Sequence, residues 1–241
     1  MLKNEMFILL LISIAFSFSI CAHQASLEAG QIESNFNYFQ LPNKDGNRIK
    51  LEETNENLAY RATYKHSLNE SSYLYFLVAP LAVTYDVIPN SAFNFDEMSF
   101  DAGIPTNVRY RFNSYRVGWF KKGGDGSFQF WGGFVAKIRD AFIEVEQDGK
   151  HKKFSNVGLA PLLGFGFLAK PFDVLGLYSH TDALTASQGS AYDSVLKLNV
   201  YFGDNHWLGT GKRIVGGGVD NDTLKNFAQF DYHVLDYTFQ Y

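Results

Sequence analysis

The sequence predicts an all-β protein, an antiparallel up-and-down transmembrane β-barrel of about ten strands, within a range of roughly 8–12. Three observations lead to this prediction. The chain begins with an apolar segment typical of export, its strand-like segments are joined by connections that alternate in length, and it ends in a strand that carries aromatic residues on one face.

The N-terminal segment has the features of a secretory signal peptide. Lys3 gives a positive start, and the apolar run 7–20 is too short to span a bilayer comfortably as a helix. Ala22 then offers a cleavage site. We therefore expect residues 1–22 to be removed and residues 23–241 to form the barrel. An uncleaved anchor helix is the alternative.

Cys21 is the only cysteine, and it would leave with the signal peptide. A lipoprotein anchored through Cys21 is disfavoured, because the large Ile20 stands where a small residue is needed. A mature chain without cysteine has no disulfide, no thiol nucleophile and no thiolate-bound metal. The histidines also lack the spacing of a zinc site. We therefore expect no cofactor and no metal.

The composition favours strands and limits the classes of function. Aromatic residues make up 17% of the chain, which favours strands and an interface where half-apolar rings are stable. The net charge of −4 offers no basic field, so we expect no nucleic-acid partner. The mean hydropathy of −0.14 fits a barrel as well as a soluble protein, because polar lumen faces lower the average.

Alternating apolar residues mark the expected strands. The clearest stripe runs from Tyr73 to Val87 on odd-numbered positions, and Tyr73 and Tyr85 bracket a length that would span the apolar layer of a membrane. Similar alternation occurs in 58–65, 156–167 and 193–202. The expected strands are 24–40, 48–66, 72–87, 104–120, 128–146, 153–169, 173–185, 191–203, 206–217 and 227–241.

The connections between these segments favour a membrane barrel over a soluble β-sandwich, which shares the same alternation. The even-numbered connections are mostly tight, as at 68–71, 170–172 and 203–205, with 121–127 somewhat longer. The odd-numbered ones, such as 41–47 and 88–103, tend to be longer or more polar. Short turns at one end and longer loops at the other are typical of outer-membrane barrels. An even number of strands also places both termini at the periplasmic end.

The C-terminal strand carries a second signal. Leu235, Tyr237, Phe239 and Tyr241 share one face and alternate with polar residues. This pattern resembles the terminal strand of Gram-negative outer-membrane β-barrel proteins. The resemblance implies that these four residues form the insertion signal, that the barrel assembly machinery and outer-membrane lipid are partners, and that the protein resides in the outer membrane after passing through the periplasm.

Three further segments extend the resemblance. Asn113-Ser114-Tyr115-Arg116, Lys137-Ile138-Arg139-Asp140-Ala141 and Gly216-Gly217-Gly218-Val219-Asp220 look like segments of a group of uncharacterised proteobacterial outer-membrane barrels. In that group an acidic residue would stand near Val215 or Gly216, and this chain departs from the pattern there. The resemblance covers roughly Thr106 to Tyr241, and it implies a fold and a location but no activity.

Charged residues on the polar faces of the strands form the candidate site. A change of pattern at Arg139-Asp140 predicts a β-bulge that would turn both side chains inward. In a narrow lumen these charges would pair into a plug of salt bridges, or they would line a constriction or site for a small polar or anionic solute. The predicted lumen charge cluster consists of Arg109, Arg111, Arg116, Lys137, Arg139, Asp140, Glu144, Asp193, Lys197, Arg213 and Asp236.

Small residues form a second stripe on the polar face of one strand, at Gly158, Ala160, Gly164 and Gly166. They would allow a sharp bend, or leave room for a bulky residue such as Trp131 opposite. The functional alternative is a vacant cavity for a ligand.

The expected function is that of a small outer-membrane barrel, structural or concerned with binding or passage of a small polar solute, and not an enzyme. One alternative is an outer-leaflet lipid-modifying enzyme, since His180 and Asp182 share a face and Ser187 and Ser190 follow. No recognisable lipase motif surrounds them. The other alternative is a secreted soluble β-sandwich that binds a ligand or partner.

Overall fold

The computed structural model describes residues 23–44, 46–51, 58–187 and 189–241, with the side chains of 34 and 35 excepted, and every statement below concerns these residues. The expected signal peptide lies outside them. The strands are β1 (Gln24–Gln40), β2 (Ile49–Leu51), β3 (Leu58–Asn69), β4 (Ser72–Ala79), β5 (Ala82–Val87), β6 (Phe93–Phe95), β7 (Met98–Phe100), β8 (Thr106–Gly124), β9 (Phe128–Gln147), β10 (Lys150–Phe172), β11 (Leu175–Ala186), β12 (Gly189–Phe202), β13 (His206–Asp220) and β14 (Lys225–Gln240).

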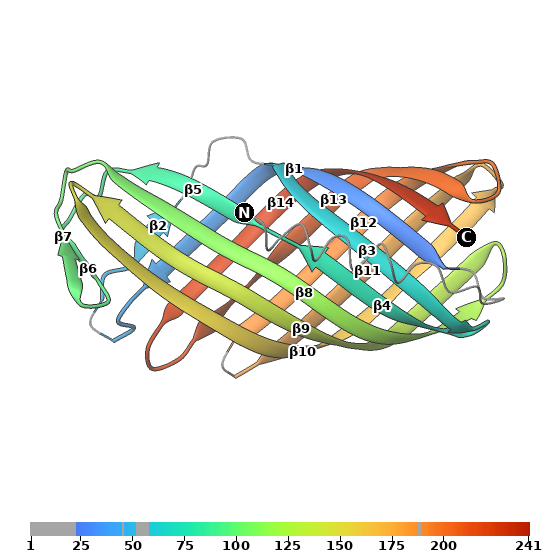
Figure 1. Cartoon of the computed structure of the whole chain (residues 1–241), viewed down its shortest axis with the longest axis horizontal. Helices are drawn as coiled ribbons and strands as arrows, with labels where there is room; N and C mark the ends of the chain where they lie inside the picture. The colour runs from blue at the N-terminus through green and yellow to red at the C-terminus, as the bar shows by residue number, and fades with distance from the viewer. Residues whose placement is uncertain (1–22, 45, 52–57, 188) are drawn as a thin grey trace, which may run out of the picture.

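The strands form a closed antiparallel barrel (Figure 1). Neighbours along the chain pair with one another from β8 to β14, and β1 closes the wall against β14, from Gln24 opposite Gln240 to Gln40 opposite Lys225. β4 and β5 both pair with β8 and act as one strand interrupted at Pro80, which has no N–H to donate. In the same way, β2 and β3 both pair with β1. With each of these two pairs counted as one strand, the wall has ten strands, as predicted. Closure excludes the soluble sandwich.

The outer face of the wall is apolar, and much of the lumen is polar. Val157, Leu159 and Phe134 are among the most exposed side chains, at 71%, 73% and 66%. Arg116 and Asp193 are charged and point inward, where they are 3% and 2% exposed. A soluble protein has the opposite arrangement, with apolar side chains inside and polar ones outside. A wall in contact with lipid requires the arrangement seen here. Leu235, Tyr237 and Phe239 of β14 have the expected outward parity, and Tyr241, directly after the strand, is also exposed.

One stripe has the opposite orientation to the prediction. Tyr73, Tyr75, Leu77 and Tyr85 face the lumen and are almost fully buried. The outward positions of β4, such as Phe76, are also apolar, so alternation alone could not show which face of this strand meets lipid.

The two ends of the barrel differ as expected, with one correction. The turn end carries the first and last described residues, His23 and Tyr241, whose backbones are joined by two hydrogen bonds. It also carries the connections 70–71, 125–127, 173–174 and 203–205. At the loop end the segment 88–105 is long and contains the β6–β7 hairpin. The β9–β10 connection, expected to be longer, is the two-residue turn Asp148-Gly149 with positive φ at both residues.

The turn at 125–127 is held by the side chain of Asp125. Its carboxylate accepts hydrogen bonds from the Ser127 hydroxyl at 2.8 Å and from the backbone N–H groups of Ser127 and Phe128 at 3.0 and 3.1 Å. These donors lower the pKa of Asp125, because they stabilise its charged form. The side chain thus fixes the chain reversal between β8 and β9.

Candidate binding site in the barrel lumen

A network of buried ion pairs crosses the middle of the lumen, with Asp193 of β12 at its centre. The Asp193 carboxylate contacts three arginines: Arg61 at 2.7 Å, Arg116 at 2.7 Å and Arg213 at 2.5 Å. Arg116 also donates to Asp182 at 2.6 Å. The strands involved, β3, β8, β11, β12 and β13, come from different parts of the wall, so the network fastens the wall across the bore.

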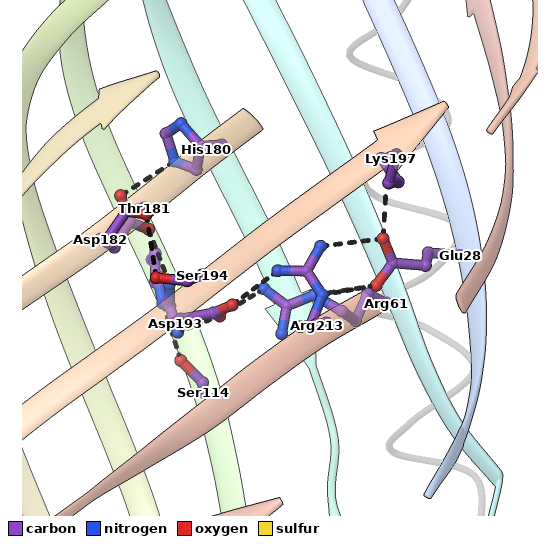
Figure 2. Close-up of polar contacts among 11 residues, drawn as sticks. Glu28, Arg61, Ser114, His180, Thr181, Asp182, Asp193, Ser194, Lys197 and Arg213 are labelled. Carbon is purple, nitrogen blue, oxygen red and sulfur yellow. Dashed lines mark hydrogen bonds and ion pairs between the residues drawn. The ribbon is translucent and has the colours of Figure 1, made fainter. Parts of the chain in front are cut away.

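Glu28 of β1 forms the second centre of the network (Figure 2). Both of its carboxylate oxygens accept hydrogen bonds from Arg213, each at 2.8 Å. Lys197 lies 3.6 Å from Glu28 and 2.6 Å from Asp236 of β14. A two-bond contact between guanidinium and carboxylate is among the strongest polar contacts in proteins, because the two groups match in geometry.

The network is balanced in charge. Its cations are Arg61, Arg116, Lys197 and Arg213, and its carboxylates are Glu28, Asp182, Asp193 and Asp236. All eight side chains are at most 11% exposed. Charges removed from water in this way are stable only when they are paired and hydrogen-bonded. The network therefore leaves no surplus charge of its own to attract a solute.

His180 of β11 is attached to this network, and both of its ring nitrogens form hydrogen bonds. The indole N–H of Trp131 donates to His180 Nδ1 at 2.9 Å, so that nitrogen must be an acceptor. His180 Nε2 then carries the proton and donates to Asp182 at 3.0 Å. With both nitrogens engaged, the ring has no site left to accept a proton from a serine. Ser187 and Ser190 lie at the loop end of the wall, and the geometry does not support a Ser-His-Asp arrangement.

A cavity of about 320 Å³ opens from this network toward the turn end. Arg61, Arg213, Glu28 and Lys197 form part of its lining, and its mouth is at the turns. Small-molecule sites in proteins measure roughly 300–1,000 Å³, so the cavity is large enough for a small ligand. Its aromatic walls are formed by Tyr73, Tyr75, Trp131, Tyr178, Tyr201 and Trp207.

Three lysines line this cavity outside the balanced network: Lys65, Lys122 and Lys170. Within the described part of the chain, none of them has a carboxylate at ion-pair distance. The Lys65 ammonium lies 5.4–5.5 Å from the ring centres of Tyr73, Trp131 and Tyr178, and Lys170 lies 4.1 Å from Tyr201. Aromatic faces stabilise these cations without neutralising them. In all, six cations and two carboxylates, Glu28 and Asp204, line the cavity.

The loop end of the lumen is closed by apolar side chains. Phe39, Tyr85, Val108 and Phe230 of the wall are at most 1% exposed and pack together there. The β6–β7 hairpin adds Phe93, Phe95 and Phe100, also buried in this cluster. Between it and the ion-pair network lies a small space of about 20 Å³, enough for about one water molecule. Among the described residues, the network and the apolar cluster therefore separate the cavity from the loop end.

The structure places seven of the eleven predicted site residues inside the barrel. Arg116, Asp193, Lys197, Arg213 and Asp236 join the network. Lys137 is buried 4.7 Å from the Phe112 ring, and Arg139 donates to Asn156 at 2.6 Å. These two have inward parity but form no ion pair among the described residues.

The other four predicted residues, Arg109, Arg111, Asp140 and Glu144, lie on the outer face of the wall. Arg111 pairs there with Asp140 at 2.6 Å, and Arg109 and Arg111 lie against the Phe142 ring. The bulge predicted at Arg139-Asp140 does not occur, because the register of β9 with both neighbours is continuous. Without it, Asp140 keeps the outward parity.

Sequence reasoning missed Glu28, Arg61, Lys65 and Asp182 as members of the site. Counting alternate positions along each strand could have found them, since each lies on the inward face of its own strand. The residues before Glu28 and Arg61, Leu27 and Tyr60, are exposed on the outer face. What the sequence could not show is which strands face each other across the bore.

The small-residue stripe on β10 makes room for large side chains. A Cβ on Gly166 would lie 2.7 Å from the Trp131 ring, and one on Gly164 would lie 2.5 Å from Phe120. Of the roles expected for this stripe, the structure shows one at Gly166: the glycine leaves room for Trp131, its partner on β9. The stripe therefore positions the aromatic wall of the cavity.

No group of three or more His, Cys, Asp or Glu side chains in the described segments is arranged to hold a metal ion. None of those segments forms a helix long and apolar enough to cross a membrane.

Comparison with family models finds no match, and neither does comparison with curated proteins. Among solved structures, Ail, the attachment invasion locus protein of Yersinia pestis, in complex with the heparin analogue sucrose octasulfate, gives a TM-score of 0.42 at 9% identity, over 90% of this chain and 99% of that one. The translocator domain of the autotransporter NalP from Neisseria meningitidis gives 0.42 at 8% identity, over 98% and 95%. The P. putida toluene transporter TodX gives 0.38 at 8%, over 93% and 91%.

The chain's own wall determines its class. It is closed by pairing of the first and last strands, apolar on the outside and charged within. Among β-sheets, only a closed wall leaves no strand edge with unpaired backbone groups in lipid. The protein is an outer-membrane β-barrel, as the resemblance of its terminal strand implied.

Proposed function

We propose that this barrel binds a small anionic ligand in the cavity at its turn end, which faces the periplasm. The observation that carries the proposal is the surplus of cations in the cavity: Lys65, Lys122 and Lys170 line it without a carboxylate partner among the described residues. A concave surface of one charge sign with poorly polarisable walls concentrates the field inside it. An anion is therefore the solute that this cavity attracts.

The aromatic walls favour a ligand that is partly flat and apolar. Trp131 and Tyr178 lie within 5.4 Å of each other, and Lys65 lies over both rings. A ligand with an anionic group and an aromatic body would place its charge on Lys65 and its body on these rings.

Binding is better supported than passage. The ion-pair network and the apolar cluster fill the lumen beyond the cavity. A solute that passed through would have to separate buried ion pairs that stabilise the wall. We infer that the ligand enters and leaves through the same mouth.

Replacing Lys65 or Lys122 with glutamine is expected to weaken binding of naphthalenesulfonate about tenfold or more, since a hydrogen bond to a charged group contributes about 1.5–3 kcal/mol. Quenching of tryptophan fluorescence in the barrel reconstituted in lipid nanodiscs measures the affinity. Naphthalenemethanol, the neutral counterpart, should bind more weakly than the sulfonate to the unmodified protein.

Lys121→Gln is the matched control, because Lys121 is the neighbour of Lys122 on β8 but points outward. It should bind the sulfonate like the unmodified protein. Equal affinity of Lys65→Gln, Lys122→Gln and Lys121→Gln would contradict the proposed site.

The unmodified barrel is expected to show no steady conductance in a planar lipid bilayer, because the network and the apolar cluster block the bore. Single-channel recording checks this. Long-lived openings in most insertions would show that the lumen is a pore and would reject the closed cavity.

A further inference from the structure

A charged cluster lies on the outer face of the wall, where β1, β13 and β14 meet. Lys212 of β13 and His233 of β14 both bind the carboxylate of Glu33 of β1, at 2.9 Å and 2.6 Å. Their side chains are well exposed, at 66% for Lys212 and 55% for His233. The three residues form a compact group outside the lumen.

Apolar side chains surround this cluster on the same face. Leu196 of β12 is the register partner of Lys212, and it is 52% exposed. On β14, the next outward residue toward the turn end is Leu235, which is 58% exposed. On β13, the next outward residue toward the loop end is Ile214, which is 41% exposed. The cluster is thus enclosed by the surface that faces lipid.

Further polar contacts extend the cluster into a stripe across the outer face. The Thr181 and Ser194 hydroxyls bond to each other at 2.9 Å, the Tyr192 hydroxyl donates to Gln229 at 2.7 Å, and Gln229 donates to Asp231 at 2.9 Å. The opposite side of the barrel differs, since the outward residues of β9 and β10 include Phe134, Ile138, Leu159 and Leu163. We call the outward residues Thr181, Tyr192, Ser194, Lys212, Gln229, Asp231, His233 and Glu33 the polar stripe.

Acyl chains are a poor environment for this polar stripe. They offer no hydrogen bonds, and a charged side chain that faces them is strongly disfavoured near the middle of the membrane. Polar residues at membrane depth are stable when another polar surface covers them. The stripe therefore indicates a protein contact within the membrane.

We propose that the polar stripe is the interface between two copies of this barrel. The stripe carries both charge signs, with Lys212 bound to Glu33 and with Asp231 on the neighbouring strand β14, so it is complementary to itself. In a two-fold dimer the same patch meets on both copies, and Lys212 of each copy can face the carboxylates of the other. The two carboxylates disfavour an anionic lipid headgroup as the occupant, because they would repel it.

Cross-linking in intact outer membranes tests the proposal. Thr210→Cys places a thiol on β13 beside Lys212, facing outward, and Leu163→Cys places one on the opposite side of the barrel. A short bismaleimide should join Thr210→Cys into a species of twice the barrel's mass, at least fivefold more than Leu163→Cys or the unmodified chain. The gel shift between unboiled and boiled samples confirms that each variant is folded.

Charge variants identify the contact. Adding Lys212→Glu to Thr210→Cys should reduce the dimer at least fivefold, because the stripe then loses its lysine and gains a third carboxylate. Adding Glu33→Lys as well should restore it. Cross-linking of Thr210→Cys no stronger than that of Leu163→Cys would overturn the proposal. A product with the mass of a different protein would overturn it too, as would a dimer unaffected by Lys212→Glu.

Discussion

Replacing Asp193 with alanine is expected to destabilise the barrel by about 3–5 kcal/mol, the usual cost of leaving a buried charge without its partner. Asp193 is 2% exposed, and it is the only carboxylate that contacts all three of Arg61, Arg116 and Arg213 among the described residues. Without it, three guanidinium groups would face one another across the bore. Urea unfolding in lipid vesicles, followed by tryptophan fluorescence, measures the loss.

Asp204→Asn is the control for this prediction. Asp204 is an exposed carboxylate in a turn, with no ion pair among the described residues, and its replacement should change the free energy of unfolding by no more than about 0.5 kcal/mol. If Asp193→Ala does not insert, Asp193→Asn keeps the shape of the side chain and still removes the charge. An unchanged unfolding midpoint in both Asp193 variants would show that the network does not stabilise the wall.

Replacing Gly166 with alanine is expected to cost about 1–3 kcal/mol, the range for overfilling a packed interior. A Cβ at this position would lie 2.3 Å from the backbone oxygen of Ser179 and 2.7 Å from the Trp131 ring. Neither distance is tolerable for carbon, and the backbone oxygen cannot move aside without breaking the pairing of β10 with β11. Trp131 would shift and weaken its bond to His180. Urea unfolding measures the cost, and near-ultraviolet circular dichroism reports the tryptophan.

Gly158→Ala makes the same change on the same strand and the same face. Its Cβ would meet the end of the Arg139 side chain at 3.3 Å and the Asn156 side-chain oxygen at 3.6 Å, and both of these side-chain groups can move. This variant should lose no stability. Equal loss in the two variants would show that glycine is needed for backbone freedom along β10, not for space beside Trp131.

The sequence predicted the outer face better than the lumen. The apolar stripes 157–167 and 196–202 face lipid as expected. Successive side chains of a strand point to opposite faces, so the sequence of one strand is enough to show an apolar outer face. Where both faces of a strand are apolar, as at Tyr73 and Phe76, alternation cannot assign a side. The charged residues of 109–116 show the same limit: Arg116 faces inward, and Arg109 and Arg111 face outward on the same strand.

The candidate site is built from contacts between strands that lie far apart in the sequence, and the pattern of one strand does not reveal such contacts. Glu28 and Arg213 are joined by two hydrogen bonds although they are far apart in the chain. Lys65, which lies on the expected strand 48–66, became a candidate only when the structure showed three aromatic rings around it and no carboxylate beside it among the described residues.

The sequence by itself determined that this protein is a barrel of about ten antiparallel strands with an outward-facing terminal strand, because the repeat of apolar residues and the length of the turns are local properties. The tertiary structure decided the rest. It brought Asp193 to three arginines, closed the loop end with Phe93 and Phe95, and left the cations of the cavity in surplus. These features depend on the stagger at which β1 meets β14, which sets the residues that face one another across the lumen.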